Sequence, residues 1–251
     1  MTISRKDWNN YIKKLSALNK TASEKVAKWI ETNGVDDTRQ LLDYCYAITM
    51  KYGNGSASLS ALMYDVLAEL EGQIVPPAIL APLPEYGDVA KAVQGTMKTS
   101  LNPDEIGGAV GRLVKQCGAD TTLYNCKRDG AEFAWIPSGD TCAFCITLAS
   151  RGWQTVSKNS LKNGHAEHIH SNCDCEYAVR FNSSTNVAGF DPEKYYEQYE
   201  SAEGDTPKEK INAMRRRYYA QNRDEILKQK ASAEEKREEL NSSMAEETNV
   251  N

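Results

Sequence analysis

The 251-residue sequence lacks any long apolar run. No stretch approaches the ~20 apolar residues that a membrane-spanning helix needs, and residues 1–6 lack the apolar segment of a secretion signal. An excess of one charge is also missing, because 30 Lys and Arg stand against 35 Asp and Glu, a formal net charge of -5. We therefore expect neither a membrane protein nor an exported one, and we expect a polyanion to bind only at a local basic patch.

The cysteine count does not suit a disulfide framework. Seven is an odd number, and without a secretion signal we expect reduced thiols. Four of the seven cysteines and all three histidines lie between Cys142 and Cys175. Cys45, Cys117 and Cys126 have no partner at metal-binding spacing, so we interpret them as ordinary apolar positions.

The N-terminal third carries apolar residues at helical spacing. The pattern predicts four short amphipathic helices, of which the first begins after Ser4 and the others end at Gly34, Gly53 and Gly72. Each is too short to be stable alone, so the four should pack on one another. They define a helical N-terminal region over residues 1–74.

Proline is concentrated in one segment, with four of the eight prolines in residues 76–84. Because proline lacks an amide donor and disfavours helix in the residue before it, residues 75–85 are predicted to form an extended linker. Helix should resume over 86–116 in two pieces, the second starting with Asn102 as cap and Pro103 at the first helical position. From Thr121 onward the period changes, and Asp129-Gly130 predicts a β-hairpin.

Two clusters in the middle of the chain have the spacing of a zinc site. Cys142-x-x-Cys145 offers two thiolates from one turn, and the sequence returns with His170-x-x-Cys173-x-Cys175. A structural zinc takes four such ligands. The preferred set is the first pair, Cys173, and either Cys175 or His170. The alternative is a group of buried thiols without metal.

Together these patterns predict an α+β protein. It would have the helical N-terminal region, a small zinc-stapled core of β-hairpin and α-helix within residues 86–190, and a long C-terminal helix. Residues 191–240 would form that helical extension, and residues 241–251 a disordered tail.

Two enzymatic interpretations were weighed against the same clusters. Zinc deaminases need His-x-Glu before Pro-Cys-x-x-Cys, whereas here His165-Ala166-Glu167 follows Cys142-x-x-Cys145 and Thr141 replaces the proline. A zinc-dependent nuclease of the His-Asn-His kind remains an alternative, as does a zinc-stapled nucleic-acid-binding module. Because the sequence identifies no nucleophile or general base, we expect no enzymatic activity.

Three stretches carry a resemblance to a known family. They are residues 128–145 with 148–152, the motif at residues 170–175, and Gly189-Phe190-Asp191-Pro192 with the tyrosines at 195 and 196. These residues resemble the minor capsid, or head-morphogenesis, proteins of tailed bacteriophages, a family related to the head protein F of phage Mu. The resemblance implies a structural virion protein that acts with the portal protein and the major capsid protein. It would reside in the capsid, and in the host cytoplasm during assembly.

A basic segment follows the part of the chain that carries the resemblance. Residues Lys208 to Lys230 hold eight basic and three acidic side chains, a local charge of +5. On a helix, Arg215, Arg216 and Arg217 would fan around the surface. The segment is therefore a candidate contact for packaged DNA or for an acidic portal surface. The alternative is a solvated helix of mixed charge.

Overall fold

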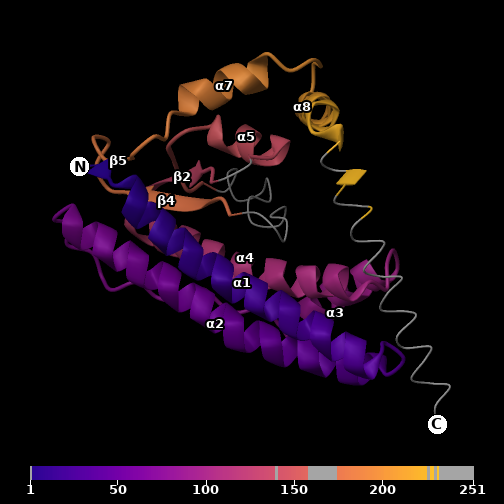
Figure 1. The fold of residues 1–251 in the computed structure, drawn as a ribbon. Coiled ribbons are helices and arrows are strands. Elements are labelled where there is room, and N and C mark those ends of the chain that lie inside the picture. Colours follow the sequence, from indigo (N-terminus) through magenta and orange to yellow (C-terminus); the bar gives the residue numbers. More distant parts are fainter. Residues whose placement is uncertain (1, 139–140, 158–173, 225–226, 229–230, 232–251) are drawn as a thin grey trace, which may run out of the picture.

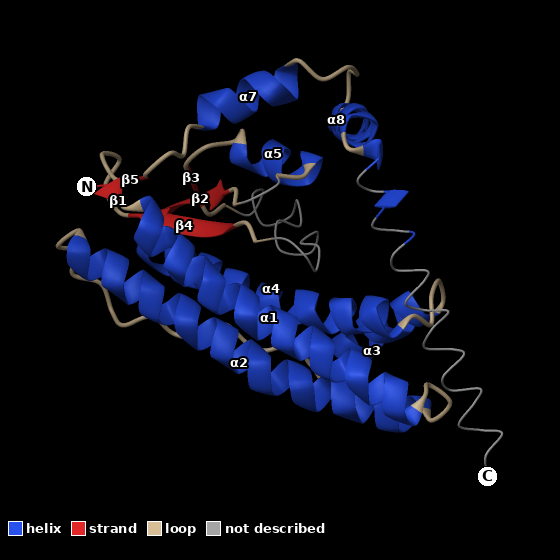
Figure 2. Cartoon of the chain, viewed as in Figure 1, coloured by secondary structure: helices blue, strands red, loops and turns tan. Residues whose placement is uncertain are grey.

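The structure is a computed structural model that combines a layer of long helices, a small sheet and two C-terminal helices (Figures 1 and 2). It describes residues 2–138, 141–157, 174–224, 227–228 and 231. The fold class is α+β, as the sequence predicts. The helices are α1 (Arg5–Asn33), α2 (Thr38–Leu70), α3 (Tyr86–Met97), α4 (Pro103–Asp129), α5 (Ala143–Ala149), α7 (Pro192–Glu200) and α8 (Pro207–Gln221). The strands are β1 (Thr2–Ile3), β2 (Glu132–Ile136), β3 (Gln154–Thr155), β4 (Glu176–Arg180) and β5 (Asn186–Val187).

The four short N-terminal helices predicted from the sequence are two long ones. Gly34 does end α1, with a φ of 72°, but α2 continues through Gly53 to Leu70. At Gly53, α2 and α4 approach each other closely: an added Cβ would lie 2.8 Å from the Cys117 sulfur of α4. This glycine therefore serves helix packing, and the prediction that it ends a helix is wrong.

The predicted hairpin at Asp129-Gly130 is also wrong. Residues 121–129 complete α4, and Gly130 is its left-handed cap with a φ of 70°. An Asp-Gly pair suits a hairpin turn and a helix C-terminus equally well, so burial decides between them. Leu123 and Cys126 are buried in the main core, which fixes this stretch as helix.

The helix α4 packs against both α1 and α2, and its glycines allow the close approach. A Cβ on Gly107 would overlap the backbone carbonyl oxygen of Ser23 in α1. A Cβ on Gly118 would lie 2.7 Å and 2.8 Å from the hydroxyls of Ser56 and Ser60 in α2. The helical layer is therefore held at a spacing that larger side chains would not permit.

The small sheet lies between the helical layer and α5 (Figure 1). Its strands run in the order β3-β2-β4 and are antiparallel, with Glu132 opposite Arg180 and Ile136 opposite Glu176. Trp135 and Tyr177 meet edge to face with ring centroids 4.7 Å apart. These aromatic rings pack in the same core as the first turns of α1, so sheet and helices share one apolar interior.

The C-terminal part of the described chain consists of two helices. The strand β5 pairs in parallel with β1, and α7 and α8 follow over the outer side of α5 (Figure 1). Ala213 and Met214 of α8 pack against Ala143 and Ala202. In the part of the chain that the structure describes, no helix is long and apolar enough to cross a membrane. The predicted tail, residues 241–251, lies outside the described residues.

Candidate functional site

The Cys-x-x-Cys pair lies at the start of α5. Cys142 is the N-cap residue, and its sulfur accepts a hydrogen bond from the backbone amide of Cys145 at 3.4 Å. Cys145 is buried, and Cys142 is partly exposed. An amide directed at sulfur stabilises a thiolate, so this turn has the polarity that a metal-binding cysteine pair uses.

Cys175 lies directly before β4, at the end of the sheet where β2 ends, because Glu176 is paired with Ile136. Its sulfur accepts a hydrogen bond at 3.4 Å from the backbone amide of Ser138, which follows β2. The buried ammonium of Lys115 in α4 donates to the Cys175 carbonyl at 2.6 Å and stands 5.6 Å from the Trp135 ring centroid. The cysteine is therefore fixed from both the sheet and the helical layer.

The three described cysteines of the predicted zinc site share one core but form no complete site. Cys145 and Cys175 are residues of the main core, and Cys142 packs against that core. The other two candidates, His170 and Cys173, lie outside the described residues. Within the described ranges, no group of three or more His, Cys, Asp or Glu side chains is placed to hold a metal ion. Zinc binding therefore stays a prediction, supported by the chemistry of thiol ligands.

The remaining cysteines are core residues, which confirms the sequence interpretation. Cys45, Cys117 and Cys126 are buried within α2 and α4. Burial raises the pKa of the Cys45 and Cys117 thiols to about 12, and it raises the pKa of the Cys126 thiol as well. All three are therefore protonated and unreactive at neutral pH.

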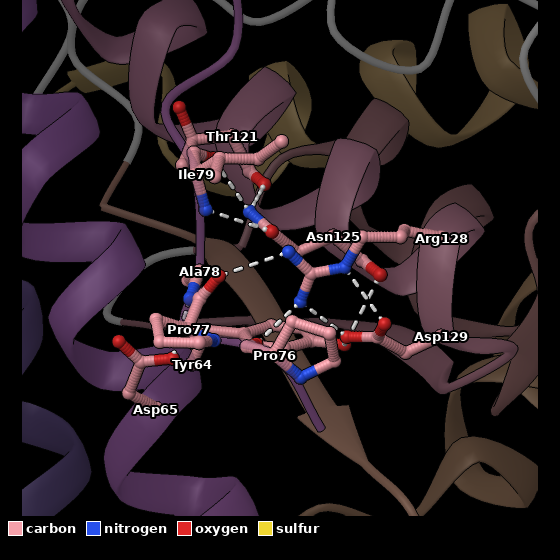
Figure 3. Close-up of polar contacts among 10 residues, drawn as sticks. All are labelled: Tyr64, Asp65, Pro76, Pro77, Ala78, Ile79, Thr121, Asn125, Arg128 and Asp129. Carbon is pink, nitrogen blue, oxygen red and sulfur yellow. Dashed lines mark hydrogen bonds and ion pairs between the residues drawn. The ribbon is translucent and has the colours of Figure 1, made fainter.

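The proline-rich connector, residues 74–85, is fastened to the helices by side chains (Figure 3). At the end of α4, the Arg128 guanidinium binds both carboxylate oxygens of Asp129 at 2.7 Å. The same guanidinium donates to the carbonyls of Pro76 at 2.7 Å and Pro77 at 2.9 Å. Because Arg presents several donors in a planar fork, one side chain holds the helix end and two connector carbonyls together.

A buried tyrosine completes this polar cluster. The Tyr64 hydroxyl of α2 donates to the Asp129 carboxylate at 2.8 Å. Hydrogen bonds from Arg128 chiefly, and then from Tyr64, lower the pKa of Asp129. Burial chiefly, with the Asp129 hydrogen bond second, raises the pKa of Tyr64. Tyr64 is therefore a neutral donor and Asp129 a charged acceptor over the physiological pH range.

Further along the connector, polar side chains of α2 and α4 satisfy its backbone. The Asn125 amide group donates to the Ile79 carbonyl at 2.8 Å and accepts from the Ile79 amide at 3.0 Å. Thr121 accepts from the Ala81 amide at 3.1 Å. The sequence analysis missed these roles. The signal was a polar pair, Thr121 and Asn125, spaced one helical turn apart among apolar positions.

The fold and these clamps define an α+β protein in which a connector is fastened to two long helices, α2 and α4, beside a small sheet. A family model described as VG15 protein matches residues 2–202, from β1 through α7. The chain therefore belongs to the VG15 family, a family of viral or phage gene proteins. No curated protein and no solved structure matches the chain. The basic helix α8 lies beyond the matched residues.

Proposed function

We propose that the chain is a structural minor capsid protein of a tailed phage that acts with the portal protein and the major capsid protein during head assembly. Membership of a viral protein family supports a viral role. The resemblance of residues 128–152 to head-morphogenesis proteins supports this particular role. The proposed role is mechanical and involves no catalytic step.

One observation carries the proposal: the resembling residues are the ones that join the layers of the fold. Arg128 clamps the connector, Phe133 and Trp135 fill the core between sheet and helices, and Cys142 caps α5. The resemblance therefore concerns residues that build the architecture. A shared architecture is what we expect among proteins that fill the same position in a particle.

The shape of the helical layer suits this role. The helices α1 and α2 have 29 and 33 residues, which corresponds to lengths of about 44 and 50 Å. Long rigid helices expose extended sides to which several neighbours can bind at once. Such an element can connect shell and portal while the head is assembled.

We also propose one structural zinc, held by four of Cys142, Cys145, His170, Cys173 and Cys175. Its role would be to link α5 to the start of β4 across a segment whose sequence is largely polar. Metal binding at such a site contributes directly to folding.

The basic helix α8 is proposed as a contact for packaged DNA. Arg215 and Arg216 are exposed, and neither forms a hydrogen bond or ion pair with another described residue. By contrast, Lys210 is paired with Glu200 at 2.8 Å, and Arg217 donates to the Ser201 carbonyl. Arg215 and Arg216 are therefore among the cations of α8 that are available to phosphate groups.

Quantitative mass spectrometry of purified procapsids and mature heads tests the proposed role. We expect the chain in both particles, at a copy number well below that of the major capsid protein. A deletion of the gene should reduce the yield of filled heads, and expression of the wild-type chain in trans should restore it. Absence of the chain from both particle types would refute the proposal.

A further inference from the structure

The outward side of α2 is unusually poor in charge. About one residue in four is charged over the whole chain, but residues 44–68 contain only Lys51 and Asp65. Leu62, Val66 and Leu70 are 60%, 39% and 59% exposed, and they follow one another at four-residue intervals. Such spacing places them along one side of the helix. This side is therefore apolar, and it is exposed in the isolated chain.

Three other exposed residues of this side are small. Ala47, Asn54 and Ser58 are all exposed, and each leaves room for a second helix to approach. The helix α2 forms the lower edge of the helical layer in Figure 1, and the connector passes beside its C-terminal half. We call the exposed residues from Ala47 to Glu69, together with the partly buried Asp65 between them, the α2 face.

The α2 face carries Lys51, the partly buried Asp65 and, at its end, Glu69, and the first two stand at equal distances from Ser58. Lys51 precedes Ser58 by seven residues, and Asp65 follows it by seven. Seven residues make about two helical turns, so the three side chains lie on the same side of the helix. A face with this arrangement is complementary to itself when it is turned end for end.

We propose that two copies of the chain associate through the α2 face as an antiparallel pair centred on Ser58. In a two-fold contact, a residue some distance before the centre meets the residue the same distance after it in the other copy. Lys51 of each copy would therefore meet Asp65 of the other, which forms two ion pairs. Leu62 of each copy would pack over Asn54 of the other.

The contacts within one chain leave both charges available for this pairing. One oxygen of Asp65 accepts a hydrogen bond from the Ala78 amide at 2.7 Å, which holds the carboxylate in place. The other oxygen points away from the polar cluster around Arg128 (Figure 3). Lys51 forms no hydrogen bond or ion pair with a described residue, although its ammonium lies 5.7 Å from the Tyr52 ring centroid.

The size of the α2 face indicates how strong the association should be. The face is about 33 Å long and roughly 10 Å wide. Such a contact is smaller than the interface of a typical permanent complex. We therefore expect a reversible dimer whose population rises with concentration over the micromolar range.

Charge reversal in the full chain tests this arrangement by analytical ultracentrifugation. The variant Lys51→Asp opposes carboxylates in both contacts, and Asp65→Lys opposes ammonium groups. Each variant alone should raise the dimer dissociation constant by about tenfold or more. An equimolar mixture of the two restores both ion pairs in a heterodimer. We expect the mixture to associate nearly as tightly as the wild type.

The mixture also controls for damage to the fold, since Asp65→Lys loses the bond to Ala78. A chain that is merely misfolded would not regain association on addition of the Lys51→Asp variant. Lys28→Asp on α1 and Leu101→Glu before α4 are matched exposed controls and should leave the dimer unchanged. A monomeric wild type, an unaffected single variant, or a mixture that stays monomeric would each overturn the proposal. None of these outcomes bears on the presence of the chain in phage heads.

Discussion

Replacement of Gly107 by alanine tests whether α4 is held at a spacing that only glycine permits. Gly107 is buried where α4 crosses α1, and a new Cβ would overlap the backbone carbonyl oxygen of Ser23. A backbone atom cannot turn aside as a side chain can. The whole of α1 must shift, and with it the core residues that α1 contributes.

The expected effect is the difference between two opposed terms. Alanine is intrinsically better than glycine in a helix by about 1 kcal/mol. Overpacking in a close-packed interior costs about 1–3 kcal/mol and occasionally more, and a clash with backbone belongs at the upper end of that range. We therefore expect Gly107→Ala to lower the free energy of unfolding by about 2 kcal/mol.

Urea unfolding followed by circular dichroism measures this difference. The matched control is Gly95→Ala in α3, where an added Cβ meets no atom within 4 Å. That variant should be unchanged in stability or gain up to about 1 kcal/mol. A Gly107→Ala variant as stable as the wild type would show that α1 and α4 are not packed as closely as described.

Three further predictions concern charge, metal and DNA. Because the pKa of Asp129 is lowered in the folded state, its stabilising effect should be present above about pH 4 and should be lost as the pH falls. The variant Asp129→Asn should therefore be less stable than the wild type at neutral pH and should lose less stability on acidification. Urea titrations at several pH values measure both differences. Elemental analysis of the reduced protein should find one zinc per chain, absent from Cys142→Ser and retained in Cys45→Ala, and a wild type without zinc would contradict the proposed site. Binding of the full chain to duplex DNA at low salt should weaken steeply at physiological salt and should be largely lost on Arg215→Glu with Arg216→Glu, whereas binding unaffected by that change would favour a solvated helix.

Local signals at helix ends were readable from the sequence. Ser4 was predicted to precede the first helix, and its hydroxyl accepts from the Asp7 amide at 3.1 Å. Asn102 caps α4 with Pro103 at its first position, also as predicted. These features depend on residues within one turn of each other, so the sequence alone contains the necessary information.

The errors in the fold occurred where one residue type suits two structures. Gly53 and Gly130 are both glycines beside apolar helical patterns, yet the first lies inside a helix and the second ends one. The difference lies in what each one faces. Gly53 faces Cys117 of a helix more than sixty residues later in the chain, and no local pattern shows that neighbour.

The candidate site, like the fold, could be predicted from the sequence only in part. The sequence identified the cysteine clusters, and the structure brings Cys142, Cys145 and Cys175 into one core. Nothing in the sequence of the predicted linker, residues 75–85, indicated that side chains of α4 bind its backbone. The clamp pairs Arg128 and Asn125 with connector groups about fifty residues away, and backbone carbonyls leave no signature in a sequence.

The sequence by itself determined most of the helical segments, where several of them begin and end, and which cysteines stand at metal-binding spacing. Those properties follow from propensity, capping and spacing, which act over a few residues. Only the tertiary structure decided that glycines of α4 set the spacing of the helices and that α2 leaves a charge-poor face exposed. Close packing is a property of two surfaces in contact, and the partner of each surface is chosen by the whole chain.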